Sequence, residues 1–185
     1  MATKTTALKL SSQEYVEQAK QELAKNHKQK NIFDLASIEK VSINVGIGDY
    51  KNDSKARTDI EGYLTKLTGQ KPKTVASRVN IAGFKLRKGE PVGFAVTLRG
   101  KKMQDFLLHL IYIALPRSRD FKGIKKTAFD ARYRSYSLGI PSAAIFPVIG
   151  FDIPVRFGMQ INVVFKHDGE ENKELLETLN FPFSK

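Results

Sequence analysis

The sequence contains no cysteine in its 185 residues and only three histidines, which lie far apart. The absence of cysteine excludes a disulfide framework, a cysteine-ligated zinc site and a thiol nucleophile, and it fits a reducing compartment. The scattered histidines form no cluster for a metal site or a catalytic triad. No apolar run approaches the roughly 18 residues that a membrane-spanning helix requires. The sequence therefore predicts no metal, no other cofactor and no insertion into a membrane.

Acidic residues are scarce in two stretches, and this makes the charge uneven. The chain has 31 Lys and Arg against 19 Asp and Glu, a formal net charge of +12. Residues 71–102 hold nine basic residues and one acid, Glu90, for a net charge of +8. Residues 115–134 hold seven basic residues and two acids, for a net charge of +5. The other 133 residues therefore sum to −1. A surface charged for solubility mixes both signs, so two basic blocks predict a polyanionic partner. Nucleic acid is favoured over an anionic membrane because neither block contains a basic amphipathic helix.

Two stretches alternate apolar residues with small or polar ones, which is the pattern of a half-buried strand. In residues 40–47 the outward positions are Ser42, Asn44, Gly46 and, just beyond, Gly48. In residues 92–99 they are Gly93, Ala95, Thr97 and Arg99. These outward residues are mostly small, which leaves room for another molecule to approach the backbone. Residues 159–165 alternate in the same way, and residues 73–76 predict a further short strand.

Four segments have the spacing or caps of helices: residues 12 to about 30, 53 to 68, 101 to 115, and 170 to 179. Ser11 or Ser12 is the expected cap of the first, and Asn52 or Asp53 that of the second. Gly69 should end the second helix, and Pro116 the third. Residues 117–150 are expected to hold the second basic block and an irregular stretch around Ile140-Pro141 and Phe146-Pro147, and the chain is expected to have four or five strands in all.

Residues 77–90 predict a long basic loop, and loops of more than about 12 residues in compact domains are usually functional. Gly83 and Gly89 are expected to let this loop fold sharply. The order of elements shows no regular βαβ repeat. It predicts a single α+β domain over residues 12–185, preceded by an N-terminal arm at 1–11. Its sheet should be mainly antiparallel, with helices packed on one face and an open RNA-binding face.

The signals for an enzyme are weak. Gly46 and Gly48 begin a dinucleotide-binding fingerprint, but its third glycine is replaced by Lys51. Asp49, Asp53 and Asp59 are close enough in sequence to suggest a metal-dependent nuclease. A helix cap at Asp53 and an exposed helix face at Asp59 explain these acids more simply. Binding rather than catalysis is expected, with a stand-alone RNA-binding regulator or a metal-dependent nuclease as the alternatives.

Six motifs in a fixed order carry a resemblance that covers residue 12 to the C-terminus. They are SINVGIG (42–48), TGQKP (68–72), IAGFKLRKG (81–89), VTLRG (96–100), LPRSRDFKG (115–123) and SLGI (137–140). With them, the chain strongly resembles the family of ribosomal protein number five of the bacterial large subunit, which binds 5S ribosomal RNA. The resemblance implies a cytoplasmic, ribosome-bound protein of the central protuberance, with neighbouring proteins there and 23S rRNA as further partners.

The resemblance also implies roles for individual residues. In the family, the residues at Asn44, Gln70 and Thr97 contact 5S rRNA, and amide and hydroxyl groups suit base edges and 2′-hydroxyls. Nearby cations would hold phosphates, namely Lys71, Lys73 and Arg99. The family's basic loop reaches the P-site tRNA, and its counterparts here are Arg78, Asn80, Gly83, Phe84, Lys85, Arg87 and Lys88. The second block would face a protein of the small-subunit head or more RNA, through Arg117, Arg119, Lys122, Lys125, Lys126, Arg132 and Arg134.

Overall fold

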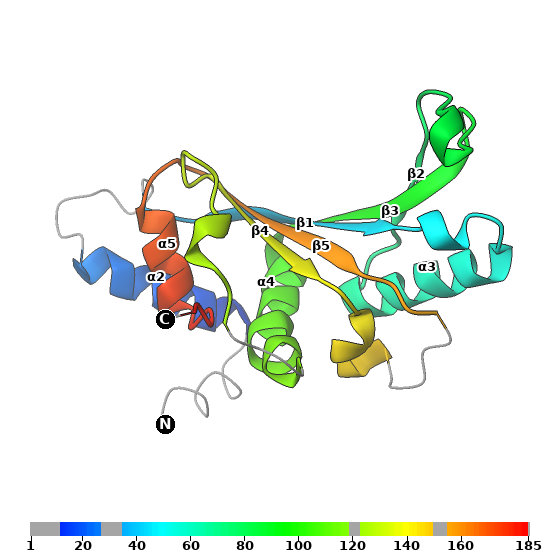
Figure 1. Cartoon of the computed structure of the whole chain (residues 1–185). Coiled ribbons are helices and arrows are strands. Elements are labelled where there is room, and N and C mark those ends of the chain that lie inside the picture. Colours follow the sequence, from blue (N-terminus) through cyan, green and yellow to red (C-terminus); the bar gives the residue numbers. More distant parts are fainter. Residues whose placement is uncertain (1–11, 27–34, 119–122, 150–154, 185) are drawn as a thin grey trace. The chain divides into compact units, whose positions relative to one another are not determined.

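The computed structural model describes residues 12–26, 35–118, 123–149 and 155–184 (Figure 1). Its α-helices are α2 (Ser12–Asn26), α3 (Ser54–Thr68), α4 (Gly100–Leu108) and α5 (Glu171–Thr178). Its strands are β1 (Ile38–Gly46), β2 (Lys73–Ala76), β3 (Pro91–Leu98), β4 (Ser135–Ile140) and β5 (Met159–Phe165). The five strands form one sheet in the order β2-β3-β1-β5-β4.

The sheet is antiparallel, which confirms the predicted α+β class. β2 pairs antiparallel with β3, with Lys73 opposite Ala95 and Val75 opposite Gly93. At the other edge, the Phe165 amide donates to the Arg134 carbonyl at 2.9 Å, and the Ala143 amide donates to the Phe157 carbonyl at 2.9 Å. These two bonds show that β4 and β5 run in opposite directions.

The chain forms two compact units, and β1, β3, β4 and β5 each contribute residues to both. The first unit comprises Met1–Val41, Leu98–Leu138 and Asn162–Lys185. In its described part, α2 packs against α4 and α5. Its core includes Val16, Ala19, Leu23, Met103, Phe106, Leu107, Leu175 and Leu176. The rings of Tyr15 and Tyr112 meet edge to face at 5.9 Å between centroids, and Asn180 donates to both hydroxyls.

The second unit comprises Ser42–Thr97 and Gly139–Ile161. Its helix α3 buries Ala56, Ile60 and Leu64. The helix begins where the predicted cap Asp53 accepts a hydrogen bond from the Ala56 amide at 3.0 Å. It ends as predicted at Gly69, which is left-handed with φ 63°.

The structure corrects two predictions of regular structure. Residues 135–140, where no strand was assigned from the sequence, form the edge strand β4. Its apolar residues Tyr136, Leu138 and Ile140 alternate with Ser135, Ser137 and Gly139, so the strand pattern is present in the sequence although it is only six residues long. Pairing with β5 at the edge of the sheet fixes this short segment as a strand. The helix predicted to run to Leu115 is α-helical only to Leu108 and continues as a π-helix over His109–Ala114 and a 3-10 turn at Leu115–Arg117. Ser11 and residues 27–30 lie outside the described residues.

The candidate RNA interface

The three residues expected to contact 5S rRNA, Asn44, Gln70 and Thr97, all belong to the second unit. Asn44 on β1 and Thr97 on β3 are exposed, whereas their neighbours Ile43 and Val96 are buried. Gln70, between α3 and β2, is exposed as well. Within the described part of the chain, none of the three uses its side chain in a hydrogen bond. Their donors and acceptors are therefore available to another molecule.

Strand register places a cation on the same face of the sheet. Lys73 lies opposite Ala95, and directly paired residues of antiparallel strands point to the same side. Thr97 follows Ala95 by two residues and shares that side. Lys73 is exposed, as is every residue of β2. The face formed by Asn44, Lys73 and Thr97 thus combines amide, hydroxyl and ammonium groups, which are the groups that bind RNA edges and phosphates.

The turn before β2 is held by a buried threonine. The Thr68 hydroxyl donates to the Leu64 carbonyl at 2.7 Å and accepts from the Gln70 amide at 3.3 Å. These bonds fix the backbone of Gln70 and leave its side chain in solvent. Lys71, 81% exposed, makes a 3.4 Å ion pair with Glu61, and so exposed a pair is readily exchanged for a phosphate.

Arg99 differs from the other predicted contacts because it belongs to the first unit and is already paired. Its guanidinium donates to the Glu39 carboxylate at 3.0 Å. That hydrogen bond lowers the pKa of Glu39 below its usual value. Binding a phosphate at Arg99 would therefore compete with Glu39.

The small residues predicted to point outward differ in whether the space beside them is free. Gly46 and Gly48 are exposed, and a Cβ added at either would meet nothing within 4 Å. Gly93 is buried instead, and a Cβ there would lie 2.7 Å from the Val45 carbonyl oxygen. The prediction that Gly93 leaves room for a partner is thus wrong, because neighbouring strand β1 takes that space.

Residues 77–90 form the predicted loop, and it is internally bonded. Ile81 and Leu86 exchange backbone hydrogen bonds of 3.0 and 3.1 Å, and the Ser77 amide donates to the Glu90 carbonyl at 2.8 Å. Gly89 has φ 90°, as the sharp turn predicted there requires. The second positive φ falls on Lys85, at 50°, whereas Gly83 lies in the 3-10 turn Ala82–Phe84 without one. The loop thus turns sharply at both glycines, but only Gly89 has the positive φ that favours glycine.

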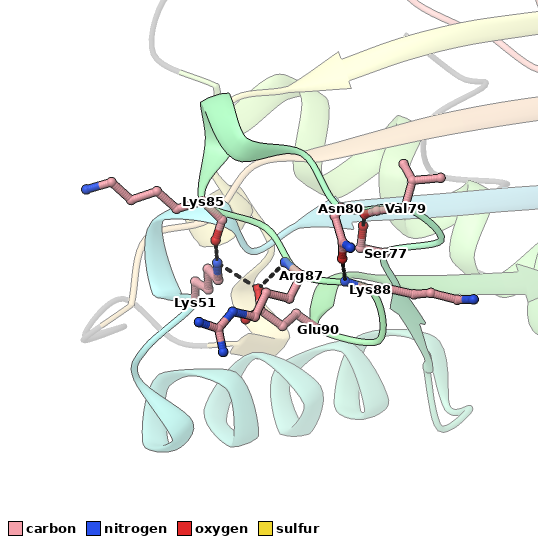
Figure 2. A network of polar contacts seen from close by, with 8 residues as sticks. All are labelled: Lys51, Ser77, Val79, Asn80, Lys85, Arg87, Lys88 and Glu90. Atoms are coloured by element: carbon pink, nitrogen blue, oxygen red, sulfur yellow. Dashed lines mark hydrogen bonds and ion pairs between the residues drawn. The ribbon is translucent and has the colours of Figure 1, made fainter.

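Side chains also brace the base of the loop (Figure 2). Lys51, from the segment before α3, forms a 2.7 Å ion pair with Glu90 and donates to the Lys85 carbonyl. Glu90 further accepts from the Arg87 amide at 3.0 Å. That backbone hydrogen bond and then Lys51 lower the pKa of Glu90. On the other strand of the loop, Asn80 accepts from the Lys88 amide at 2.7 Å.

This network gives a structural role to Glu90, the single acid of the first basic block. Glu90 is occupied by Lys51 and a backbone amide, so its charge is compensated inside the protein. The loop cations, by contrast, are exposed and make no ion pair in the part of the chain that the structure describes; they are Arg78, Lys85, Arg87 and Lys88. Lys51 was not predicted as part of the site. The only signal in the sequence was that Glu90 is the single acid of a basic block. That suggests a cationic partner for Glu90 but does not identify Lys51.

The second basic block is partly tied to acids and to the C-terminal segment. Lys126 pairs with Glu177 at 3.3 Å and Arg134 with Asp168 at 3.7 Å. Lys125, Arg132 and Arg117 are exposed, and Arg119 and Lys122 lie outside the described residues. The Ile124 amide donates to the Pro182 carbonyl at 2.9 Å, and the Ser184 amide donates back to the Ile124 carbonyl at 2.9 Å. Residues 181–184 thus hold the middle of this block in place at Ile124.

An aromatic cluster supports the same region. Phe129 contacts the rings of Tyr133, Tyr136, Phe165 and Phe183. The Tyr136 hydroxyl donates to the Lys125 carbonyl at 3.0 Å, and burial raises the pKa of Tyr136 to about 12. Tyr136 and Phe165 are buried in the first unit, and Phe129, Tyr133 and Phe183 are half-buried beside them, so this cluster serves packing.

Comparison with known proteins decides the family. Residues 31–87 match the family model of ribosomal protein L5, and residues 91–183 match the model of the C-terminus of the same ribosomal family. Large ribosomal subunit protein uL5 of Oceanobacillus iheyensis is 41% identical over 94% of this chain and 97% of its own length. The uL5 protein of Thermoanaerobacter sp. is 47% identical over 84% of this chain and 88% of its own length, and that of Ralstonia nicotianae is 42% identical over 91% and 94%. The chain belongs to the uL5 family of large ribosomal subunit proteins.

Membership in the uL5 family confirms the predicted resemblance and the broad function. The chain is a structural component of the large ribosomal subunit, it works with ribosomal RNA in translation in the cytoplasm, and it is not an enzyme. The nuclease alternative is therefore wrong. In the described residues, no group of three or more His, Cys, Asp or Glu side chains is placed to hold a metal ion, and Asp53 serves as a helix cap. No helix in that part of the chain has the length and apolar character to cross a membrane.

Proposed function

We propose that this uL5 family member binds 5S rRNA in the central protuberance, and that both units act together as one RNA-binding domain. The observation that carries this proposal is the exposed face of β1, β2 and β3 in the second unit. Asn44, Gln70 and Thr97 present unused polar groups there, with Lys71 and Lys73 beside them. Cations supply affinity for phosphates, and the amide and hydroxyl groups select the site.

The other contacts of the proposal come from the basic blocks. Loop 77–90 contacts the P-site tRNA through its exposed cations and Asn80, Gly83 and Phe84. The block from Arg117 to Arg134 contacts a protein of the small-subunit head or 23S rRNA, with the neighbouring proteins of the central protuberance nearby. The N-terminal arm predicted at residues 1–11 lies outside the described residues.

Alanine substitutions test the 5S contact. Replacing Asn44, Gln70 or Thr97 by Ala is expected to weaken 5S rRNA binding by about 1–3 kcal/mol for each well-formed interaction that the substitution removes. Binding to an unrelated RNA of equal length should barely change, because phosphate contacts remain. The measurement is a filter-binding titration with both RNAs, and equal weakening on the two would contradict the role in selection.

Two controls define the surface. Thr74 is an exposed threonine of β2 that lies opposite Phe94 and hence on the other side of the sheet, so Thr74→Ala should leave 5S binding unchanged. Shortening loop 77–90 should likewise spare 5S binding and impair the function of reconstituted ribosomes. A collapse of 5S binding in the shortened variant would contradict the assignment of the loop to tRNA.

A further inference from the structure

Exposed apolar side chains gather on the basic loop and the strand that leads into it. The described residues contain five exposed large hydrophobic side chains, and four of them fall within ten residues of sequence. Those four are Val75, Val79, Ile81 and Phe84, and the fifth is Val148. Phe84 is 75% exposed, the largest fraction of the five. Single exposed apolar residues are ordinary, but a cluster of them in one segment marks a contact surface.

The backbone holds Phe84 in this position. Phe84 ends the 3-10 turn Ala82–Phe84, and the following Lys85 adopts a left-handed conformation that a non-glycine residue rarely takes. The Lys85 amide closes the turn on the Ala82 carbonyl at 3.0 Å, and Lys51 donates to the Lys85 carbonyl. The exposed ring therefore sits on an ordered turn. Figure 2 shows the contact of Lys51 with the Lys85 carbonyl that braces the end of this turn.

We propose that Phe84 stacks on an unpaired base of a folded RNA while the loop cations neutralise the phosphates around it. This rests on the proposed function of loop 77–90 as an RNA contact and adds the chemical feature that the loop recognises. An aromatic ring stacks on the face of any accessible base, and Arg and Lys beside it bind the backbone. In a duplex the base faces are covered by their neighbours. The target is therefore an RNA loop with an exposed base.

Charge favours RNA over the other partners that an apolar surface can take. Four exposed cations surround Phe84 in sequence, namely Arg78, Lys85, Arg87 and Lys88. The only acid of the loop, Glu90, is paired with Lys51 and so does not repel phosphate. Membrane binding uses an amphipathic helix with a broad apolar face, whereas this apolar segment comprises the end of strand β2 and part of the loop that follows it.

A single tryptophan reports on stacking directly, because the chain has none of its own. The variant Phe84→Trp in the full chain is titrated with a tRNA transcript, with an RNA duplex of the same number of nucleotides, and with vesicles of phosphatidylcholine and phosphatidylglycerol. Stacking predicts that the tRNA quenches the fluorescence and that the duplex does not. Equal quenching by the duplex, or a response to vesicles in place of tRNA, would overturn the proposal.

Affinities separate stacking from phosphate binding. Phe84→Ala is expected to lower tRNA affinity about tenfold with the same salt dependence, since base stacking is worth one to two factors of ten. Arg87→Gln should lower the affinity and also flatten the salt dependence. Val148→Ala, an apolar residue 52% exposed outside the loop, is the matched control and should change neither.

The outcomes distinguish this inference from the proposed function. If Phe84→Ala binds tRNA as the unchanged chain does while Arg87→Gln is impaired, the loop binds RNA without stacking and this inference is wrong. If both variants bind tRNA normally, the tRNA role of the loop fails as well. Binding of 5S rRNA, which uses the sheet face, should be normal in all three variants.

Discussion

At the scale of single residues, the pair of Lys51 and Glu90 decides how the basic loop is held. Lys51→Met is expected to loosen loop 77–90, because it removes both the ion pair and the hydrogen bond to the Lys85 carbonyl. The measurement is amide hydrogen exchange in the free protein. Exchange should accelerate at Ile81, Leu86 and Gly89, whose amides bond within the loop. Glu61→Gln, which breaks the separate pair with Lys71, is the control, and unchanged exchange in Lys51→Met would contradict the bracing role.

Acid should loosen the same loop. Hydrogen bonding from the Arg87 amide and Lys51 lowers the pKa of Glu90 below its ordinary value of 4.5. A lowered carboxyl pKa means that the folded protein favours the charged form of Glu90. The stabilisation of the loop by charged Glu90 is therefore complete above pH 4.5 and is lost as the pH falls through the lowered pKa. Loop exchange, corrected for its intrinsic pH dependence, should thus be constant near neutral pH and rise only in that acidic range. The Glu90→Gln variant should lack this rise.

At the scale of elements, the C-terminal segment and the second basic block depend on a glycine. Gly123 has φ 89°, and a Cβ there would lie 2.6 Å from Ser184 Cα and 2.7 Å from its nitrogen. Gly123→Ala is therefore expected to destabilise the protein by about 1–3 kcal/mol, through backbone strain and the clash with a main chain that cannot yield alone. Urea denaturation measures this change. In the control Gly62→Ala in α3, the added Cβ has nothing within 4 Å, so this change should stabilise the protein by about 0.5–1 kcal/mol. Equal effects of the two changes on stability would contradict this explanation.

At the scale of the whole molecule, the concentration of charge should control RNA affinity. Each phosphate that a cation neutralises contributes a slope of about −0.7 to −0.9 to the logarithm of affinity against that of salt concentration. The affinity for 5S rRNA should therefore fall steeply with salt, and Lys73→Ala should reduce the slope by about one. Lys55→Ala, an exposed lysine of α3 outside both blocks, should leave it unchanged. A salt titration measures both, and a flat response would contradict the role of phosphates.

Local patterns predicted most of the elements because they act over a few residues. The alternation of Val41, Ile43 and Val45 orients β1, and Asp53 and Gly69 cap α3 where predicted. The same alternation correctly predicted that the side chains of Asn44 and Thr97 are exposed. The prediction did not include β4, although Tyr136, Leu138 and Ile140 alternate there with small and polar residues, because the pattern covers only six residues and follows a basic segment.

By itself the sequence determined the family, the two basic blocks and the exposure of Asn44 and Thr97, because composition, motifs and periodicity are local properties. Only the tertiary structure decided which residues meet across long separations. It paired Lys51 with Glu90, placed the Val45 carbonyl against Gly93, and bound residues 181–184 to Ile124. Such contacts arise when the chain closes around its core, and many sequences of the same local pattern could close differently. The number and clustering of the basic residues thus follow from the sequence. The fold determines that some of these cations lie on a loop braced by Lys51.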